Sequence, residues 1–156
     1  MRAGVRLGID VGRARVGVAR SDPGALLAVP VETVARAADG DADVRRIADL
    51  AAEYEAIEAV VGHPLSLSGH PTASTDDAVA FAGRLADALG IPVRLVDERL
   101  STVTAQQALR ANGKKAKQQR AIVDQAAAVV ILQHALDAER ASGSPGGILV
   151  ETTERP

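Results

Sequence analysis

The chain has 156 residues and a mass of 16.1 kDa, a length that suits one domain and excludes two full ones. The hydrophobic fraction of 47%, the charged fraction of 24% and the net charge of −2 are ordinary for a globular protein, so disorder along the whole length is excluded. The absence of cysteine excludes a disulfide framework, a thiolate zinc site and a cysteine nucleophile.

Three short apolar runs near the N-terminus predict consecutive strands at Val5–Val11, Arg15–Arg20 and Leu26–Val34. The turns between them are short, which indicates an antiparallel meander. Apolar residues at helical spacing then predict a helix over residues 43–55.

The rest of the chain alternates between predicted strands and helices. In order, these are a strand at Ile57–Val61, a loop at Gly62–Pro71, a helix at Thr72–Leu89 ended by Gly90, a strand at Pro92–Val96, a helix from Ser101 or Thr102 to about Ala111, a basic linker, and a buried helix at Ala121–Ala138. The two later strands each follow a helix, which is typical of right-handed parallel crossovers.

We therefore predict an α/β fold with a five-stranded mixed sheet, in which three antiparallel strands are followed by two parallel ones. Helices should cover both faces of the sheet. The predicted domain spans residues 1–140. Residues 141–156 are rich in Gly, Ser, Pro, Thr and Glu, and we expect them to form a flexible tail.

Acidic residues stand at the ends of predicted elements. Asp10 ends the first strand, Asp97 and Glu98 end the fifth, and Asp124 lies one turn into the last helix. An ionised carboxylate beside apolar sequence is costly to bury unless it is paired or coordinated. The carboxyl ends of parallel strands border a crevice, so these acids lie close together if the first and fifth strands flank the fourth.

Clustered carboxylates repel one another and bind protons unless cations neutralise them. Oxygen ligands without His or Cys suit Mg²⁺ or Mn²⁺ better than Zn²⁺, and two such ions can clamp the attacking and leaving oxygens of a phosphodiester. Each acid also has an ordinary structural explanation. Asp10 suits a turn before Gly12, Asp124 suits a helix N-terminus, and Glu98 suits an ion pair with Arg99 or Arg94.

The positive charge is concentrated in two segments of the chain. Residues 1–20 carry five arginines against one acid, and residues 99–123 carry six basic residues and no acid. Such clusters indicate phosphate contacts, although a solvated loop explains the second one equally well. The predicted nucleic-acid-binding residues are Arg13, Arg15, Arg99, Arg110, Lys114, Lys115, Lys117 and Arg120.

Four segments resemble the YqgF family of ribonuclease-H-like proteins, described as pre-16S rRNA nucleases and Holliday-junction-resolvase homologues. They are GIDVGRARVGVARSD from Gly8, VVGHPLSLSG from Val60, DERLST from Asp97 and VDQAAAVVIL from Val123. The similarity runs from about Leu7 to Leu136. The middle loop departs from the family pattern, because His63, Ser66 and Ser68 replace the usual Leu, Asn and Asp.

The resemblance implies a ribonuclease-H-like fold and a nuclease site at Asp10, Glu98 and Asp124 that holds Mg²⁺ or Mn²⁺, with two ions expected. Asp97 is a substitute or an outer partner. Because neighbouring strand residues face opposite sides of a sheet, we favour Glu98 over Asp97 as the ligand. The implied reaction is hydrolysis of phosphodiester bonds in structured nucleic acid, at the 5′ end of pre-16S rRNA during ribosome biogenesis.

Other functions remain open on the sequence alone. One is a Holliday-junction resolvase acting on branched DNA, for which a homodimer would suit two cleavage points. Another is a non-catalytic protein that binds nucleic acid or the transcription machinery. The phosphate loop of actin-like ATPases also resembles Gly8–Arg20, but those proteins need two such domains. We expect a soluble cytoplasmic protein without membrane contact, because no apolar run suits a bilayer span.

Overall fold

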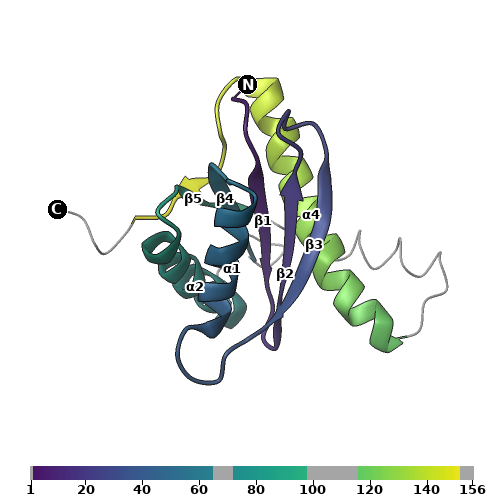
Figure 1. Ribbon diagram of the computed structural model, residues 1–156, viewed down its shortest axis with the longest axis vertical. Helices are drawn as coiled ribbons and strands as arrows, with labels where there is room; N and C mark the ends of the chain where they lie inside the picture. Colours follow the sequence, from purple (N-terminus) through teal and green to yellow (C-terminus); the bar gives the residue numbers. More distant parts are fainter. Residues whose placement is uncertain (1, 65–71, 98–115, 152–156) are drawn as a thin grey trace.

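The computed structural model describes residues 2–64, 72–97 and 116–151, and for residues 116–123 it describes the helical backbone alone. The fold is a mixed sheet with helices on both faces (Figure 1). Its elements are β1 (Arg6–Val11), β2 (Arg15–Ser21), β3 (Ala28–Ala35), α1 (Ala42–Glu53), β4 (Glu58–His63), α2 (Ala73–Leu89), β5 (Val93–Asp97), α4 (Ala116–Ser142) and β6 (Ile148–Leu149).

The strand order is β3-β2-β1-β4-β5-β6. The first three strands form the predicted antiparallel meander, and β4 pairs in parallel with both β1 and β5. The α/β class and the mixed sheet are therefore confirmed. The first and fifth strands flank the fourth, so the carboxyl ends of β1, β4 and β5 meet at one edge of the sheet.

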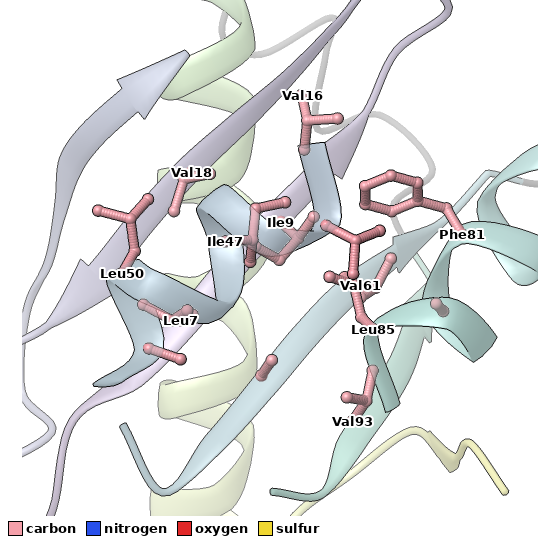
Figure 2. Close-up of a cluster of buried hydrophobic side chains, with 14 of the residues drawn as sticks. Leu7, Ile9, Val16, Val18, Ile47, Leu50, Val61, Phe81, Leu85 and Val93 are labelled. Carbon is pink, nitrogen blue, oxygen red and sulfur yellow. The ribbon is translucent and has the colours of Figure 1, made fainter. Parts of the chain in front are cut away.

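Two apolar layers sandwich the sheet because side chains alternate between its faces. On one face, Leu7 and Ile9 of β1 and Val16 and Val18 of β2 pack under α1 and α2, with Phe81 among the buried contacts (Figure 2). On the other face, a smaller cluster packs under α4. Its buried members are Ala19, Ala25, Ala28, Val60, Ala128, Ile131, Leu132 and Leu136.

Local signals account for the ends of α2. The Thr72 hydroxyl accepts a hydrogen bond from the backbone N–H of Thr75, and the Thr75 hydroxyl accepts one from the N–H of Thr72, which completes a capping box. Gly90 ends the helix with φ 70°, a left-handed conformation that favours glycine. Both ends agree with the sequence prediction.

The C-terminal part differs from the prediction in two places. β6 adds a sixth strand, antiparallel to β5, within the residues predicted as a tail. α4 begins at Ala116 rather than Ala121 and continues to Ser142, so the end of the predicted basic linker is helical. The predicted helix from Ser101 or Thr102 lies outside the described residues. Within the described part of the chain, no helix is long and apolar enough to cross a membrane.

Candidate metal and nucleic-acid site

Two glycines let α4 lie directly on the sheet. A Cβ atom at Gly8 of β1 would stand 2.6 Å from the Cβ of Leu132 and 2.7 Å from the backbone oxygen of Ala128. A Cβ atom at Gly17 of β2 would overlap the backbone oxygen of Asp124. The two glycines therefore fix the height of the helix above the strands, and Gly17 fixes where Asp124 lies.

Asp10 faces the same side of the sheet as this helix. It is the Cα partner of Gly17 in the antiparallel β1–β2 pair, and residues directly opposite each other in such a pair project to one face. The alternation along β1 agrees, since Gly8, two residues earlier, lies under α4 while Ile9 is buried on the other face. The half-buried side chain of Asp10 thus projects toward the region that Asp124 occupies.

Asp124 is held in place by an ion pair. Nε of Arg15 donates to Oδ2 of Asp124 over 2.7 Å, and the Asp124 side chain is 15% exposed. The next residue, Gln125, donates from its amide to the Thr33 hydroxyl at 2.9 Å. Thr33 is in turn the Cα partner of Gly17. These contacts fix the rotation of α4, so that Asp124 is directed to the end of the β1–β2 hairpin.

The structure changes one explanation of Asp124. The sequence places this acid one turn into the last helix, where the helix dipole would favour it. Because α4 begins at Ala116, Asp124 lies beyond the second turn, and the dipole effect falls off within the first. Its position is instead set by Arg15 and Gly17.

The carboxyl end of β5 places Asp97 on the other face. Val96 packs against the cluster under α4, whereas Leu95 belongs to the core under α1 and α2. By alternation, Asp97 faces the α1–α2 side, and it is the Cα partner of His63. Glu98 lies outside the described residues. Arg94, one expected partner of Glu98, contacts Glu58 at 3.0 Å.

Among the predicted phosphate contacts, Arg13 lies exposed in the β1–β2 turn and Arg15 pairs with Asp124. Lys117 and Arg120 belong to the first turns of α4, where the backbone alone is described. The remaining predicted residues lie outside the described ranges. They are Arg99, Arg110, Lys114 and Lys115.

Arg36 supports the site and was not predicted. It donates to the backbone oxygen of Gly12 at 2.8 Å and to both oxygens of Asp77, at 2.9 and 3.0 Å. The guanidinium also lies over the ring of Phe81, 5.0 Å from its centre. Hydrogen bonding from Arg36 holds the pKa of Asp77 below its usual value. Arg36 thereby ties the turn after Asp10 to α2. Because both partners of Arg36 are distant from it in the sequence, no local sequence pattern indicates these contacts.

The donor set fits a hard divalent cation. Asp10 and Asp124 offer carboxylate oxygens on one face, and the missing side chain of Gly17 lets the α4 backbone at Asp124 lie directly on β2, opposite Asp10. Within residues 2–64, 72–97 and 124–151, no group of three or more His, Asp or Glu side chains is arranged to hold a metal. The remaining ligands of such an ion would come from another part of the chain, from water or from the substrate.

Among solved structures, the fold is similar to Thermus thermophilus RuvC in complex with a Holliday junction substrate. The TM-score is 0.58 at 20% identity, and the match covers 92% of this chain and 99% of that one. A second T. thermophilus RuvC structure matches with a TM-score of 0.51 at 22% identity over 91% of this chain and 99% of that chain. The molecule thus has the ribonuclease-H-like fold of RuvC, as predicted.

The family follows from the sequence comparisons. The family model described as "RuvX: Holliday junction resolvase" matches residues 4–138, and the chain belongs to this family. A protein of Clavibacter sepedonicus is 65% identical over 96% of this chain and 93% of its own length. One of Leifsonia xyli is 62% identical over 97% of each chain. Both are named "Putative pre-16S rRNA nuclease". The chain is accordingly a nuclease, which confirms the resemblance and the enzyme class.

Proposed function

We propose that the chain is a metal-dependent nuclease whose catalytic residues and metal ligands are Asp10, Glu98 and Asp124. The observation that carries this proposal is that Asp10 lies opposite Gly17 in the β1–β2 pair and that the α4 backbone at Asp124 packs on Gly17, on the same face of the sheet. Arg15 pairs with Asp124, and carboxylates that share one partly buried region repel one another unless cations neutralise them. Carboxylate oxygens without His or Cys suit Mg²⁺ or Mn²⁺.

Glu98 is proposed as the third ligand in preference to Asp97. Val96 faces α4, and Asp97 faces the α1–α2 side. The residue after Asp97 would return to the face of Asp10 and Asp124 if the alternation of β5 continued. This supports Glu98, with Asp97 as an outer partner.

Divalent ions held by these carboxylates, two of Mg²⁺ or Mn²⁺ in our proposal, would supply the charge that stabilises the attacking and leaving oxygens of a phosphodiester. The chain's own part is to position that charge. Gly17 and Gln125 fix the helix that carries Asp124, and Arg36 fixes the turn after Asp10. The exposed Arg13 is suited to a phosphate of the bound strand.

The proposed substrate is the 5′ end of precursor 16S rRNA, in the cytoplasm during ribosome biogenesis. The names of the relatives in Clavibacter and Leifsonia support it. Branched DNA is the second candidate, because the family description names a Holliday junction resolvase. A homodimer is proposed for branched DNA only, since two symmetric cuts need two sites.

The basic residues at 99–120 are proposed to hold the substrate backbone. They are Arg99, Arg110, Lys114, Lys115, Lys117 and Arg120. If about five phosphates are neutralised, the logarithm of the association constant should fall with the logarithm of salt concentration with a slope near −4 to −5. Binding with this slope and no cleavage under any metal condition would support the non-catalytic alternative.

The test measures cleavage of a 5′-extended 16S precursor fragment and of a four-way DNA junction, each with Mg²⁺ or Mn²⁺. Asp10→Asn should reduce the rate at least about a hundredfold, because it removes one of the charges that hold the metal. Asp49→Asn is the matched control, since Asp49 is exposed on α1 away from the site. Equal background cleavage by wild type and Asp10→Asn on both substrates would refute the catalytic assignment.

A further inference from the structure

The ion pair between Arg15 and Asp124 joins a residue expected to bind phosphate to one expected to bind metal. The Nε–Oδ2 distance is 2.7 Å, which is the short distance of a charge-assisted hydrogen bond. The two partners differ in exposure. The Asp124 side chain is 15% exposed, whereas the Arg15 side chain is 37% exposed. The guanidinium therefore reaches the surface while the carboxylate stays under α4.

Arg15 also lies beside Asp10. The backbone oxygen of Arg15 accepts from the N–H of Gly12 at 2.9 Å, which closes the hairpin two positions beyond the Asp10–Gly17 pair. Arg15 and Gly17 are two residues apart on β2 and so share the face that α4 covers. One guanidinium thus stands on the same face as both candidate metal ligands.

We propose that Arg15 is a positioning residue that holds the Asp124 carboxylate until a divalent cation takes its place, and then contacts a phosphate of the bound strand. The inference rests on the proposed function, because it needs a metal site at Asp124. It assigns to Arg15 two successive partners of like charge. A carboxylate and a phosphate present the same kind of oxygen acceptor to a guanidinium, so the exchange is chemically conservative.

The effect of Arg15 on metal affinity distinguishes this role from a purely structural one. A guanidinium that competes with the incoming cation for Asp124 weakens metal binding, so its removal should tighten metal binding. If Arg15 instead only orients the Asp124 carboxylate for the metal, it strengthens metal binding, and its removal should weaken metal binding. For a divalent ion and a guanidinium about 6 Å apart at an effective dielectric constant of about 40 to 80, the competing effect is about ten- to a hundredfold in affinity.

The experiment titrates Mn²⁺ into the metal-free full chain by calorimetry, without nucleic acid. The variant Arg15→Gln should bind Mn²⁺ about ten- to a hundredfold more tightly than wild type, and Arg15→Lys should resemble wild type because the charge is kept. Arg46→Gln is the matched control. It breaks another short arginine–carboxylate pair, Arg46–Glu32 at 2.6 Å, and should leave Mn²⁺ affinity unchanged.

The second readout is binding of the precursor-rRNA fragment with Ca²⁺ in place of a catalytic metal. Arg15→Gln should weaken this binding about threefold and reduce the salt slope by about one, because one phosphate contact is lost. The effect of Arg15→Gln on RNA binding should be smaller when a chelator removes divalent ions, because Arg15 then stays paired with Asp124. Unchanged or weaker Mn²⁺ binding in Arg15→Gln would overturn the exchange. So would RNA binding that Arg15→Gln leaves unaltered.

These outcomes are distinct from failure of the proposed function. If the Mn²⁺ heat of wild type persists in both Asp10→Asn and Asp124→Asn, the metal site itself is wrong and the exchange falls with it. If the heat of Mn²⁺ binding disappears in those variants but Arg15→Gln does not bind Mn²⁺ more tightly, the metal site stands and the exchange alone is refuted.

Discussion

α4 meets the sheet through charged side chains at both of its described ends, and the two ends are built differently. It runs antiparallel to β1, so that Asp124 lies near the end of β1 and Glu139 near its beginning, beside the N-terminus of the chain (Figure 1). At each end a carboxylate of α4 pairs with an arginine of the sheet. One of these pairs is buried in a network, and the other is partly open to solvent.

The Glu139 end is closed. Its side chain, 6% exposed, contacts Arg6 at 2.9 Å and Arg2 at 2.6 Å, and Arg6 is itself 2% exposed. Glu58, 4% exposed, contacts Arg2 and Arg94. Each of the two glutamates thus has two arginine partners, with Arg2 shared between them, so three positive charges face two negative ones and a further cation is disfavoured.

The Asp124 end is more exposed to solvent. Arg15 is the cation paired with Asp124 there, and Asp10 adds a second carboxylate on the same face. In our proposal, ion pairs of one type therefore serve two purposes. The buried pair at Glu139 holds the helix on the sheet. The pair at Asp124 reaches the surface and is the one proposed to exchange for another ion.

The largest expected effect is at the closed end. Glu139→Ala leaves the buried Arg6 guanidinium with the backbone oxygen of Gly4 as its remaining described partner. Removing one partner of a buried ion pair should lower the free energy of unfolding by about 4 kcal/mol, measured by urea denaturation. Mn²⁺ affinity of the folded protein should not change. A loss below about 1 kcal/mol would mean that the network does not hold α4 on the sheet.

The next largest effect on stability is expected at the two glycines on which α4 packs. Gly17→Ala forces a methyl group into the backbone of Asp124, and Gly8→Ala forces one against Leu132 and Ala128. Each should cost about 2–3 kcal/mol of unfolding free energy, because a backbone cannot yield as a flexible side chain does. Only Gly17→Ala should also weaken Mn²⁺ binding. Equal losses of metal affinity in both variants would show that the helix moves as a whole.

The pH dependence of stability distinguishes the ends further. Hydrogen bonding from Arg2 lowers the pKa of Glu139 below its ordinary value of 4.5. A carboxyl with a depressed pKa stabilises the fold above that ordinary value and loses this contribution as the pH falls through the folded pKa. The stability difference between wild type and Glu139→Gln should thus be full at pH 7 and shrink below about pH 4. A difference that stays constant across this range would refute the charged pairing.

Local patterns predicted the elements that local forces build. The apolar run Val5–Val11, the cap at Thr72 and the stop at Gly90 each lie within a few residues of the structure they specify. The meander and the crossovers follow from the lengths of the connections. The sequence singles out Asp10 because an ionised acid beside an apolar strand is costly to bury unless it is paired or coordinated, and its metal role stays a prediction.

What the sequence could not reveal depends on contacts between distant segments. Arg15 and Asp124 are 109 residues apart, and Arg6 and Glu139 are 133 apart, so no spacing rule connects them. β6 has two residues and owes its existence to pairing with β5. The start of α4 was misjudged because charge was taken as a sign of a linker, although Lys, Gln, Arg and Ala all favour helices.

The smallest effect on stability is expected at the open end, where Asp124→Asn should change the free energy of unfolding by less than about 1 kcal/mol. An ion pair that is partly exposed contributes little, and the loss of Asp124's charge also relieves its repulsion with Asp10. The double variant Arg15→Gln with Asp124→Asn isolates the pair, and its coupling energy by urea denaturation should be about 0.5–1 kcal/mol. A coupling near 4 kcal/mol would mean that the Arg15–Asp124 pair holds α4 on the sheet as the Arg6–Glu139 pair does. Such a pair would be too strong for a metal ion to displace Arg15 readily.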